Sequence, residues 1–543
     1  MKYMKVGTKP DTFYTQDATR SVLTDVPPDL IIQINNTRYL LHKFPLLLKC
    51  GLLHRQLSTS DEGPLPSSIS LHGIPGAETG FELCAKFCYG IAINLSAHNF
   101  AHAMAAALHL RMTDSVAGGN FVPKLESFFS SCILHGWKDS IVVLLHSAVL
   151  PDEQRFVIPC VDAVAGKILT PPSDVTWSFT YSRARHVREK RRSAPKDWWT
   201  EDVSELDLDL FRAVIFAVRS RKQLLPALVG EALHVYACKH LPDPDDPSAR
   251  DAGEEMGKQR RVLEAIASML PSEIGAVSGR FVVRLLKVSA IVGASASVRA
   301  ELLRRAGLQL DEVGAGDLLF PLKNKPRSYD VDMVEAILEN FLAGRFRRSA
   351  PTQAESQRRL RSTAKVAGVF DSYLEAVARD PELPASKFLG LISLLPEIAR
   401  EEHDGLYGAI DTFFKEHPEL SKSDRKQICR AIDCRKLSPE ARRHAVANDR
   451  LPLRTVVQLL FAQQEKASSS QSREASSLRY SLDSANLIQK QQEEGRRRRR
   501  RREEKERTTM ETKVATTEQA SVSSTVIERK QRRGKQKEEQ KKI

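Results

Sequence analysis

The chain has 543 residues, of which 41% are hydrophobic and 28% charged, so it can fold into two or three domains with full cores. No apolar run approaches the roughly 18 residues that a transmembrane helix needs, and the N-terminus lacks the apolar core of a signal peptide. We therefore expect the protein in the cytoplasm, at the periphery of the plasma membrane or in the nucleus. Its eight cysteines are expected to be reduced thiols.

The net charge of +14 is concentrated at one end of the chain. Residues 490–543 contain 19 Lys and Arg against 10 Asp and Glu, which places a charge of +9 there and leaves +5 of the +14 for all other residues. A basic overall balance therefore says little about the charge of the folded domains.

Residues 29–50, DLIIQINNTRYLLHKFPLLLKC, predict a β-hairpin followed by a helix. Two short apolar runs flank an Asn-Asn turn, which is a common hairpin pattern. The helix is expected at 46–48, with Gly51 as its stop. The preceding residues 1–28 are polar and end in two prolines, so we interpret them as a lead-in.

The next residues alternate between short strands and helices. We predict strands at 69–71 and 91–95, and helices at 81–89, 98–110, 121–133 and from Trp137 onward. Cys84 and Cys88 lie four residues apart in one of these helices. No partner ligands stand nearby at metal spacing, so core packing is the favoured role for both thiols.

The order strand, strand, His-Lys, helix is followed by LHGIPGAETGFELCAKFCYG and, further on, by GNFVPKLESFF. In this order the motifs resemble the BTB/POZ domain of plant proteins of the non-phototropic hypocotyl and root phototropism family. The resemblance implies an α+β domain over residues 29–135. It also implies that Asp29, His42 and Lys43 belong to the BTB fold and its dimer.

Residues 136–194 are predicted to form a helical and basic connector. Its segment from 181 to 192 carries six Arg and Lys, which we interpret as a solvated linker in preference to a nucleic-acid or nuclear-import segment. The PKDWW that follows resembles the opening of the family's second domain. Trp198 and Trp199 are candidates for a target-binding region, although a structural anchor for the first helix is favoured.

From residue 195 to 466 the strong apolar patterns have helical spacing. Regular caps, such as Ser421 with Asp424 and Ser438 before Pro439, favour a compact all-α array of short helices. The helices are expected at 206–217, 224–238, 258–269, 278–305, 331–344, 361–379, 385–396, 404–415, 423–433, 439–447 and 453–465.

The end of this second domain, residues 403–464, resembles the family almost continuously. By this resemblance, Tyr407 occupies the position of a tyrosine that the family presents for phosphorylation. Cys429 and Cys434, with His444, lack a fourth ligand at zinc spacing, so core thiols are the favoured interpretation.

Residues 467–543 are predicted to be a disordered, low-complexity basic tail, because they are rich in Ser, Gln, Glu and Arg. Leucine and isoleucine are too sparse there for a heptad seam. The seven arginines at 496–502 are candidates for binding anionic lipid, RNA or an import receptor. Within this run, Arg496, Arg499 and Arg502 are the candidates for contact with an anionic surface, and a low-complexity segment without a binding function is the equally favoured alternative.

Motifs for catalysis are missing: there is no Gly-rich phosphate loop, nucleophile elbow, His-Glu-x-x-His or paired Cys-x-x-Cys. We therefore expect no catalytic residues, no cofactor and no bound metal. The resemblance implies a non-catalytic, substrate-specific adaptor of a cullin-RING ubiquitin ligase, homodimeric through its BTB domain. It implies a role in phototropic or auxin-related signalling, beside a photoreceptor kinase or another signalling protein.

The same resemblance implies that the cullin scaffold is contacted through Phe81, Glu82 and Tyr89. In many cullin-binding BTB proteins this helix begins with an apolar-x-Glu motif, whereas here the third position is Leu83. Cullin binding is therefore expected from the family and not from this local sequence. The alternatives are a non-ligase signalling scaffold at the plasma membrane and, less favoured, a nucleic-acid-binding regulator.

Overall fold

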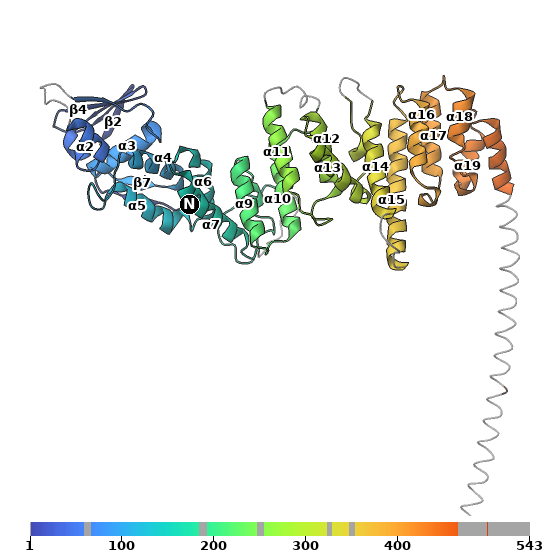
Figure 1. The fold of residues 1–543 in the computed structure, drawn as a ribbon, viewed down its shortest axis with the longest axis horizontal. Coiled ribbons are helices and arrows are strands. Elements are labelled where there is room, and N and C mark those ends of the chain that lie inside the picture. Colours follow the sequence, from blue (N-terminus) through green and yellow to red (C-terminus); the bar gives the residue numbers. More distant parts are fainter. Residues whose placement is uncertain are drawn as a thin grey trace, which may run out of the picture. The chain divides into compact units, whose positions relative to one another are not determined.

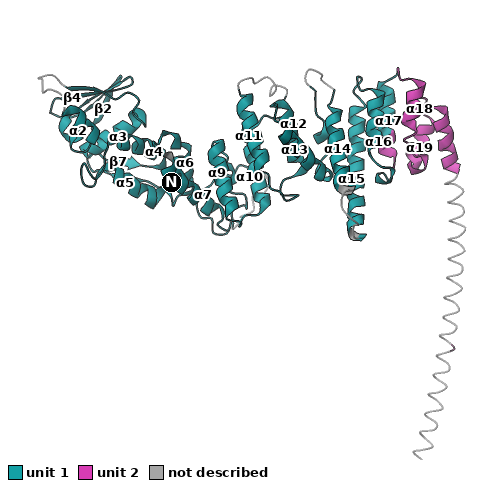
Figure 2. Cartoon of the chain, in the orientation of Figure 1, with its two compact units in different colours: residues 1–401, 408–418 teal, residues 402–407, 419–543 magenta. Residues whose placement is uncertain are grey.

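The computed structural model describes residues 2–58, 67–183, 193–246, 255–322, 328–346 and 353–464, together with Arg497. An α+β region precedes a long region of helices (Figure 1), which confirms the predicted fold class. The chain divides into two compact units, residues 1–401 with 408–418 and residues 402–407 with 419–543 (Figure 2). The predicted tail at 467–543, with Arg496, Arg499 and Arg502, lies outside the described residues apart from Arg497.

A five-stranded sheet forms the α+β region, with the strand order β2-β3-β5-β4-β6. The β3–β5 and β4–β6 pairs are parallel, and the β2–β3 and β4–β5 pairs are antiparallel. A separate two-stranded sheet joins β1 to β7. The strands are β1 (Met4–Val6), β2 (Phe13–Gln16), β3 (Thr19–Val22), β4 (Leu30–Ile34), β5 (Thr37–Leu41), β6 (Ser67–Ser70) and β7 (Ile93–Leu95).

Residues 1–28 are more than the polar lead-in that we expected, because they contain β1, β2 and β3. β2 and β3 form a hairpin in which Asp17 has a φ of 51°, a left-handed conformation that Asp tolerates better than most residues. None of the residues in these two strands is fully buried. The strands therefore need no alternating apolar pattern, and the sequence gives little sign of them.

The hairpin predicted after residue 29 is confirmed as β4 and β5, which pair in antiparallel register. Leu30, Ile32 and Ile34 are fully buried, while the two residues between them are half-buried, as strand alternation requires. Asn35 takes the left-handed conformation, with a φ of 47°, that this tight turn needs. The Asn-Asn pair thus acts as the predicted turn.

Gly51 begins a helix and is not the helix stop that the sequence suggested. Cys50 takes an extended conformation and separates the first two helices. A Cβ at Gly51 would lie 2.9 Å from a methyl carbon of Val116, so the glycine permits close packing there. The helices of this part are α1 (Lys43–Leu47), α2 (Gly51–Leu57), α3 (Ala77–Tyr89), α4 (Ala97–His109), α5 (Phe121–Phe128), α6 (Trp137–Leu145) and α7 (Glu153–Ile168).

Helices α3 and α4 pack closely within the core of the α+β region. A Cβ on Gly80 of α3 would lie 2.4 Å from the carbonyl oxygen of His102 in α4, so only glycine fits without a shift. The thiols of Cys50, Cys84 and Cys88 are buried in the same core, with 3.7 Å between the Sγ atoms of Cys50 and Cys88. Core packing thus accounts for these cysteines.

The second region is helical, and the predicted caps are present. The side chains of Ser421 and Ser438 each accept a backbone N–H from three residues further on, at 3.1 Å. The expected helix at 278–305 is two helices, because the chain turns at Gly293, whose φ is 65°. The helices are α8 (Thr200–Val203), α9 (Leu208–Ser220), α10 (Pro226–His240), α11 (Met256–Met269), α12 (Gly279–Ile291), α13 (Ala296–Leu308), α14 (Val331–Phe346), α15 (Gln353–Val377), α16 (Ala385–Leu394), α17 (Asp404–Glu416), α18 (Lys422–Cys429), α19 (Pro439–Val446) and a last one at 453–464.

Candidate docking surfaces

A cluster of polar side chains fixes the passage from β5 to α1. The backbone N–H of Lys43 donates to Asp29 Oδ1 at 2.7 Å, and the backbone N–H of His42 donates to the Tyr89 hydroxyl at 2.7 Å. His42 Nε2 lies 3.0 Å from the carbonyl oxygen of Val26, and Nδ1 lies 3.0 Å from the Tyr89 hydroxyl. Because a carbonyl can only accept, Nε2 carries a proton and donates it to Val26, and Nδ1 forms the second hydrogen bond with the Tyr89 hydroxyl.

This cluster joins residues that the sequence suggested for two different roles. Asp29, His42 and Lys43 were expected in the BTB fold and dimer, and Tyr89 in the cullin contact. Burial raises the pKa of Tyr89 to about 12, so its hydroxyl stays protonated and keeps its bond to His42. The arrangement indicates a structural role for the side chains of Asp29, His42 and Tyr89 at this corner of the fold, whereas Lys43 takes part through its backbone N–H.

The other two residues expected to meet a cullin are engaged within the chain. Phe81 is fully buried and packs edge-on against Tyr39, with 4.9 Å between ring centroids. Glu82 forms ion pairs with Arg20 at 2.9 Å and Lys86 at 3.0 Å. Our expectation that the α3 surface exposes Phe81 is therefore wrong, because this residue faces α3's packed side.

An apolar surface lies instead on α1 and just beyond its end. The side chains of Phe44 and Leu48 are 74% and 52% exposed, whereas Leu46 between them is buried. A spacing of four residues places Phe44 and Leu48 on the same side of a helical turn. The sequence reasoning missed this surface, because in an unbroken apolar run nothing shows which side chains face outward.

Trp198 and Trp199 are buried and cannot form an exposed target-binding surface in this structure. The Trp198 ring lies 4.5 Å from that of Trp137, 5.6 Å from that of Trp177 and 5.5 Å from that of Phe179, centroid to centroid. These contacts agree with the anchor interpretation. They join the predicted connector to the opening of the second domain.

A buried carboxylate reinforces the same junction. Trp137 Nε1–H donates to Asp202 Oδ2 at 2.6 Å, and the backbone N–H of Thr180 donates to the same oxygen at 3.2 Å. The Lys138 ammonium lies 3.7 Å from the other oxygen of Asp202. These partners offset the cost of removing the carboxylate from water.

Arg183 is the one basic residue of the 181–192 segment that the structure describes, and acidic side chains surround it. Its guanidinium lies 2.9 Å from Asp197 and 3.2 Å from Glu201, and it also pairs with Glu231. This arginine therefore holds the connector against the helical region. The remaining basic residues of the segment lie outside the described part.

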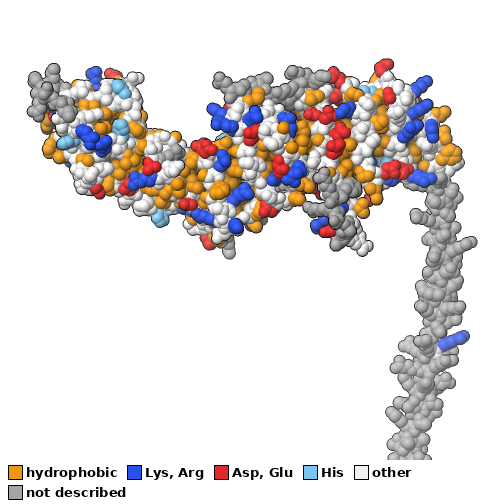
Figure 3. Space-filling view, in the orientation of Figure 1, with side chains coloured by type: hydrophobic (Ala, Val, Ile, Leu, Met, Phe, Trp, Pro, Cys, Tyr) orange, Lys and Arg blue, Asp and Glu red, His pale blue; other side chains and the backbone are white. Residues whose placement is uncertain are grey.

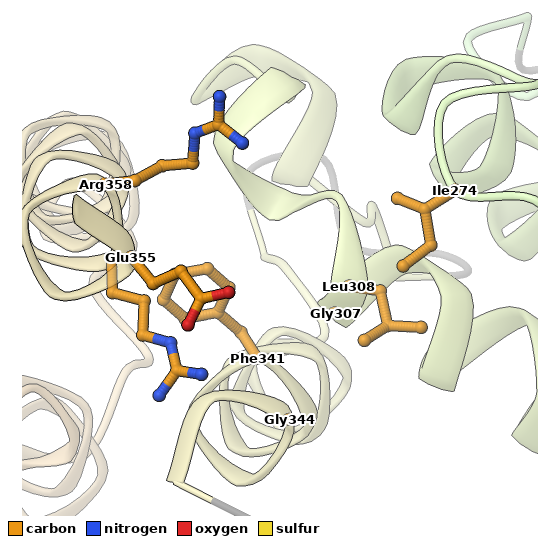
Figure 4. Close-up of a pocket in the computed structure, with 8 residues that line it drawn as sticks. Ile274, Gly307, Leu308, Phe341, Gly344, Glu355 and Arg358 are labelled. Carbon is orange, nitrogen blue, oxygen red and sulfur yellow. The ribbon is translucent and has the colours of Figure 1, made fainter. Parts of the chain in front are cut away.

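The helical region has hollows with mixed linings. Two neighbouring ones of about 370 and 420 Å³ share Pro244 and Lys287. Lys287 is buried, and its Nζ lies 3.6 Å from Asp245 and 5.8 Å from the centre of the Phe320 ring. A third hollow of about 260 Å³ is lined by Ile274, Gly307, Leu308, Phe341, Gly344, Glu355, Arg358 and Arg359 (Figure 4).

Tyr407, the expected phosphorylation position, is buried. Its hydroxyl lies 2.7 Å from His444 Nδ1, and Asn448 Nδ2–H donates to it at 3.1 Å. A kinase would have to open this packing to reach the oxygen. His444 thus contacts Tyr407, while Cys429 and Cys434 are buried. The described residues contain no group of three or more His, Cys, Asp and Glu placed to hold a metal ion.

An N-terminal five-stranded sheet with helices, followed by an array of helices, defines a BTB/POZ protein with a helical second domain. The chain matches the NPH3 family over residues 197–442. It is 49% identical over 488 residues to a BTB/POZ domain-containing protein of Arabidopsis thaliana, covering 88% of this chain and 87% of the relative. The chain therefore belongs to the NPH3 family.

Two further Arabidopsis relatives are more distant. The phototropic-responsive NPH3 family protein NPY2 is 39% identical over 499 residues, with coverage of 87% of this chain and 78% of the relative. Root phototropism protein 3 is 32% identical over 577 residues, with coverage of 85% and 77%. Among the described residues, no helix combines the length and apolar character needed to cross a membrane.

Proposed function

We propose that the protein is a non-catalytic adaptor that joins other proteins in phototropic or auxin-related signalling. The observation that carries this proposal is the similarity to NPH3 family relatives over both regions of the chain, one of them named as phototropic-responsive and another as a root phototropism protein. The α+β region would bind a cullin scaffold of a ubiquitin ligase, and the helical array would present the target.

We also propose that the α+β region forms a homodimer, and the exposed α1 surface supports this part of the proposal. Phe44 and Leu48 lie beside the corner that Asp29, His42 and Lys43 stabilise, and burying such side chains against a second copy would be favourable. On the face shown in Figure 3, basic and acidic side chains of the helical region are interspersed. On this face the mixture of charges favours protein contacts over binding to nucleic acid, which needs a continuous basic surface.

One experiment tests dimer and cullin binding together, with the full-length chain. The protein is captured on beads from plant extract, and cullin is detected in the bound fraction. The Phe44→Ser/Leu48→Ser variant should sediment as a monomer at micromolar concentration, because the apolar contact is lost. It should also retain roughly tenfold less cullin, because a dimer engages its partners twice.

Phe216→Ser is the matched control, because Phe216 in α9 is 76% exposed, much like Phe44. It should leave both readouts unchanged. If the unaltered protein captures no cullin, the ligase part of the proposal is wrong, and a signalling scaffold takes its place. If the Phe44→Ser/Leu48→Ser variant still dimerises, α1 does not form the dimer interface.

A further inference from the structure

One side of α12 runs along the two neighbouring hollows of about 420 and 370 Å³. Arg280, Arg284, Lys287 and Ile291 have the spacing i, i+4, i+7 and i+11, which gathers them on that side of the helix. Arg280 and Arg284 line the larger hollow, and Ile291 lines the smaller one. Lys287 lines both, so it stands where a charged surface meets an apolar one.

The ammonium of Lys287 donates no hydrogen bond to any residue that the structure describes. Its side chain is only 8% exposed, and its ion pair with Asp245, at 3.6 Å, is too long for a hydrogen bond. The Asp245 side chain is 75% exposed, and the contact of Lys287 with the Phe320 ring, at 5.8 Å, is a weak cation–π interaction. Buried polar groups nearly always have hydrogen-bond partners. The Lys287 ammonium can therefore bond to an acceptor from outside the chain.

The larger hollow is lined by charged side chains of both signs, namely His234, Asp243, Asp245, Arg280, Arg284, Lys287 and Asp317. Arg280 Nε lies 2.8 Å from Asp317 Oδ2, so these two charges neutralise each other. Hydrogen bonds with Cys238 and next with Glu231 raise the pKa of His234 to about 9, so this imidazole is positively charged at neutral pH. The other lining charges are therefore three cations and two aspartates. The balance favours the entry of an anion.

We propose that the two hollows bind a short peptide of a partner protein in which an acidic side chain stands beside an apolar one. The carboxylate binds between Arg284 and Lys287, which are one turn apart on α12, and takes the place of the exposed Asp245. The apolar side chain enters the smaller hollow, beside Ile291 and Phe320. This inference rests on the proposed adaptor role, because it names where the helical array would hold a partner.

The mixed lining of the two hollows determines the class of ligand. An apolar hollow next to a cationic one suits a peptide, which can carry a charged and an apolar side chain on neighbouring residues. A nucleic acid would instead bring a row of phosphates towards Asp243 and Asp245, which repel them. The same two aspartates favour a singly charged carboxylate over a doubly charged phosphate.

Peptide binding by the full-length protein tests this proposal. The probes are short peptides fixed to a sensor surface, in which one Glu stands beside one Leu in a background of Gly and Ser. In the matched set, Gln replaces Glu. The Glu peptides should bind at least about tenfold more tightly, because only a carboxylate forms charge-assisted hydrogen bonds with the buried ammonium. Lys287→Met should abolish this difference and keep the fold, since an apolar chain of similar volume replaces a buried charge.

Asp245→Asn should have the opposite effect, which a damaged fold could not imitate. Removing the exposed carboxylate frees Lys287 from its weak ion pair, so the Glu peptides should bind roughly two- to fivefold more tightly. Asp209→Asn is the matched control, because Asp209 in α9 is also exposed, at 91%, and lines neither hollow. This control should leave the affinity for the Glu peptides unchanged.

Equal binding of the Glu and Gln peptides would overturn the proposal, as would an Asp245→Asn variant that binds no better than the unaltered protein. If inorganic phosphate displaces the Glu peptides as readily as the same peptide in solution does, the hollow is a simple anion site and the peptide assignment is wrong. No cullin takes part in this measurement. A protein that captures no cullin in the earlier experiment can therefore still give the expected result here.

Discussion

The α+β region and the helical region use the residues of their motifs in different ways. In the α+β region, Asp29, His42 and Tyr89 are polar side chains that bond to backbone groups or to each other where β5 leads into α1. In the helical region, Trp198 is an apolar ring packed among other rings. Both sets stabilise the fold. The large apolar side chains open to partners, such as Phe44, are ones that the sequence reasoning did not single out.

The difference teaches that a motif readable in the sequence is not necessarily the surface that binds. A polar motif residue contributes roughly 1 kcal/mol to the free energy of unfolding through a hydrogen bond. A large buried ring contributes several times more to the same free energy through packing. The comparison therefore predicts unequal losses when single residues in the two regions are changed.

The largest effect is expected at the ring cluster. Trp198→Ala should lower the free energy of unfolding by about 3–5 kcal/mol, because a large ring is removed from among three others. Phe216→Ala, at an exposed aromatic position of the same region, should change it by less than about 0.5 kcal/mol. Urea denaturation followed by circular dichroism measures both. A loss under about 1 kcal/mol for Trp198→Ala would contradict the anchor role.

A smaller effect is expected where α3 meets α4 in the α+β region. Gly80→Ala places a Cβ 2.4 Å from the carbonyl oxygen of His102, and the forced shift should cost about 1–3 kcal/mol. Gly368→Ala in α15 is the matched change, since its Cβ would meet no atom within 4 Å. That variant should be neutral or gain up to about 1 kcal/mol, because alanine favours a helix. Equal melting temperatures for Gly80→Ala and Gly368→Ala would contradict the close packing of α3 against α4 at Gly80.

The smallest effect is a dependence on pH in the helical array. Hydrogen bonds from Arg304, and next from Arg305, lower the pKa of Glu301 from its ordinary value of 4.5 to about 2. A lowered carboxyl pKa contributes stability above the unfolded value, and this contribution fades as the pH falls from about 4.5 towards 2. Wild type should therefore melt slightly above Glu301→Gln at pH 6, and the two should converge near pH 2. A constant difference would show that the charge of Glu301 does not matter.

Much of the fold follows from local sequence signals. The Asn-Asn turn predicts the β4–β5 hairpin, and the serine caps predict where α18 and α19 begin. In each case one short-range contact decides the structure. The helix boundaries at 278–305 were less predictable, because Gly293 can sit inside a helix or end one.

Other features depend on distant partners and could not be predicted. The strands β2 and β3 exist because β3 pairs with β5 across the sheet. Gly51 begins α2, in a place where Val116 leaves room only for a hydrogen. For the candidate sites, composition identifies an apolar run but not its exposed members, so Phe44 was missed and Phe81 was misplaced. The tertiary structure alone distinguishes them.

The ring cluster around Trp198 also decides where the chain can be cut. A boundary between residues 194 and 195, as the sequence suggests, would strip Trp137, Trp177 and Phe179 from Trp198. It would also leave the Asp202 carboxylate without its indole partner. Each fragment would then expose to solvent an apolar surface that is buried in the intact chain. Fragments made at this boundary would aggregate. Their non-specific binding to other proteins could then be mistaken for specific binding of a partner.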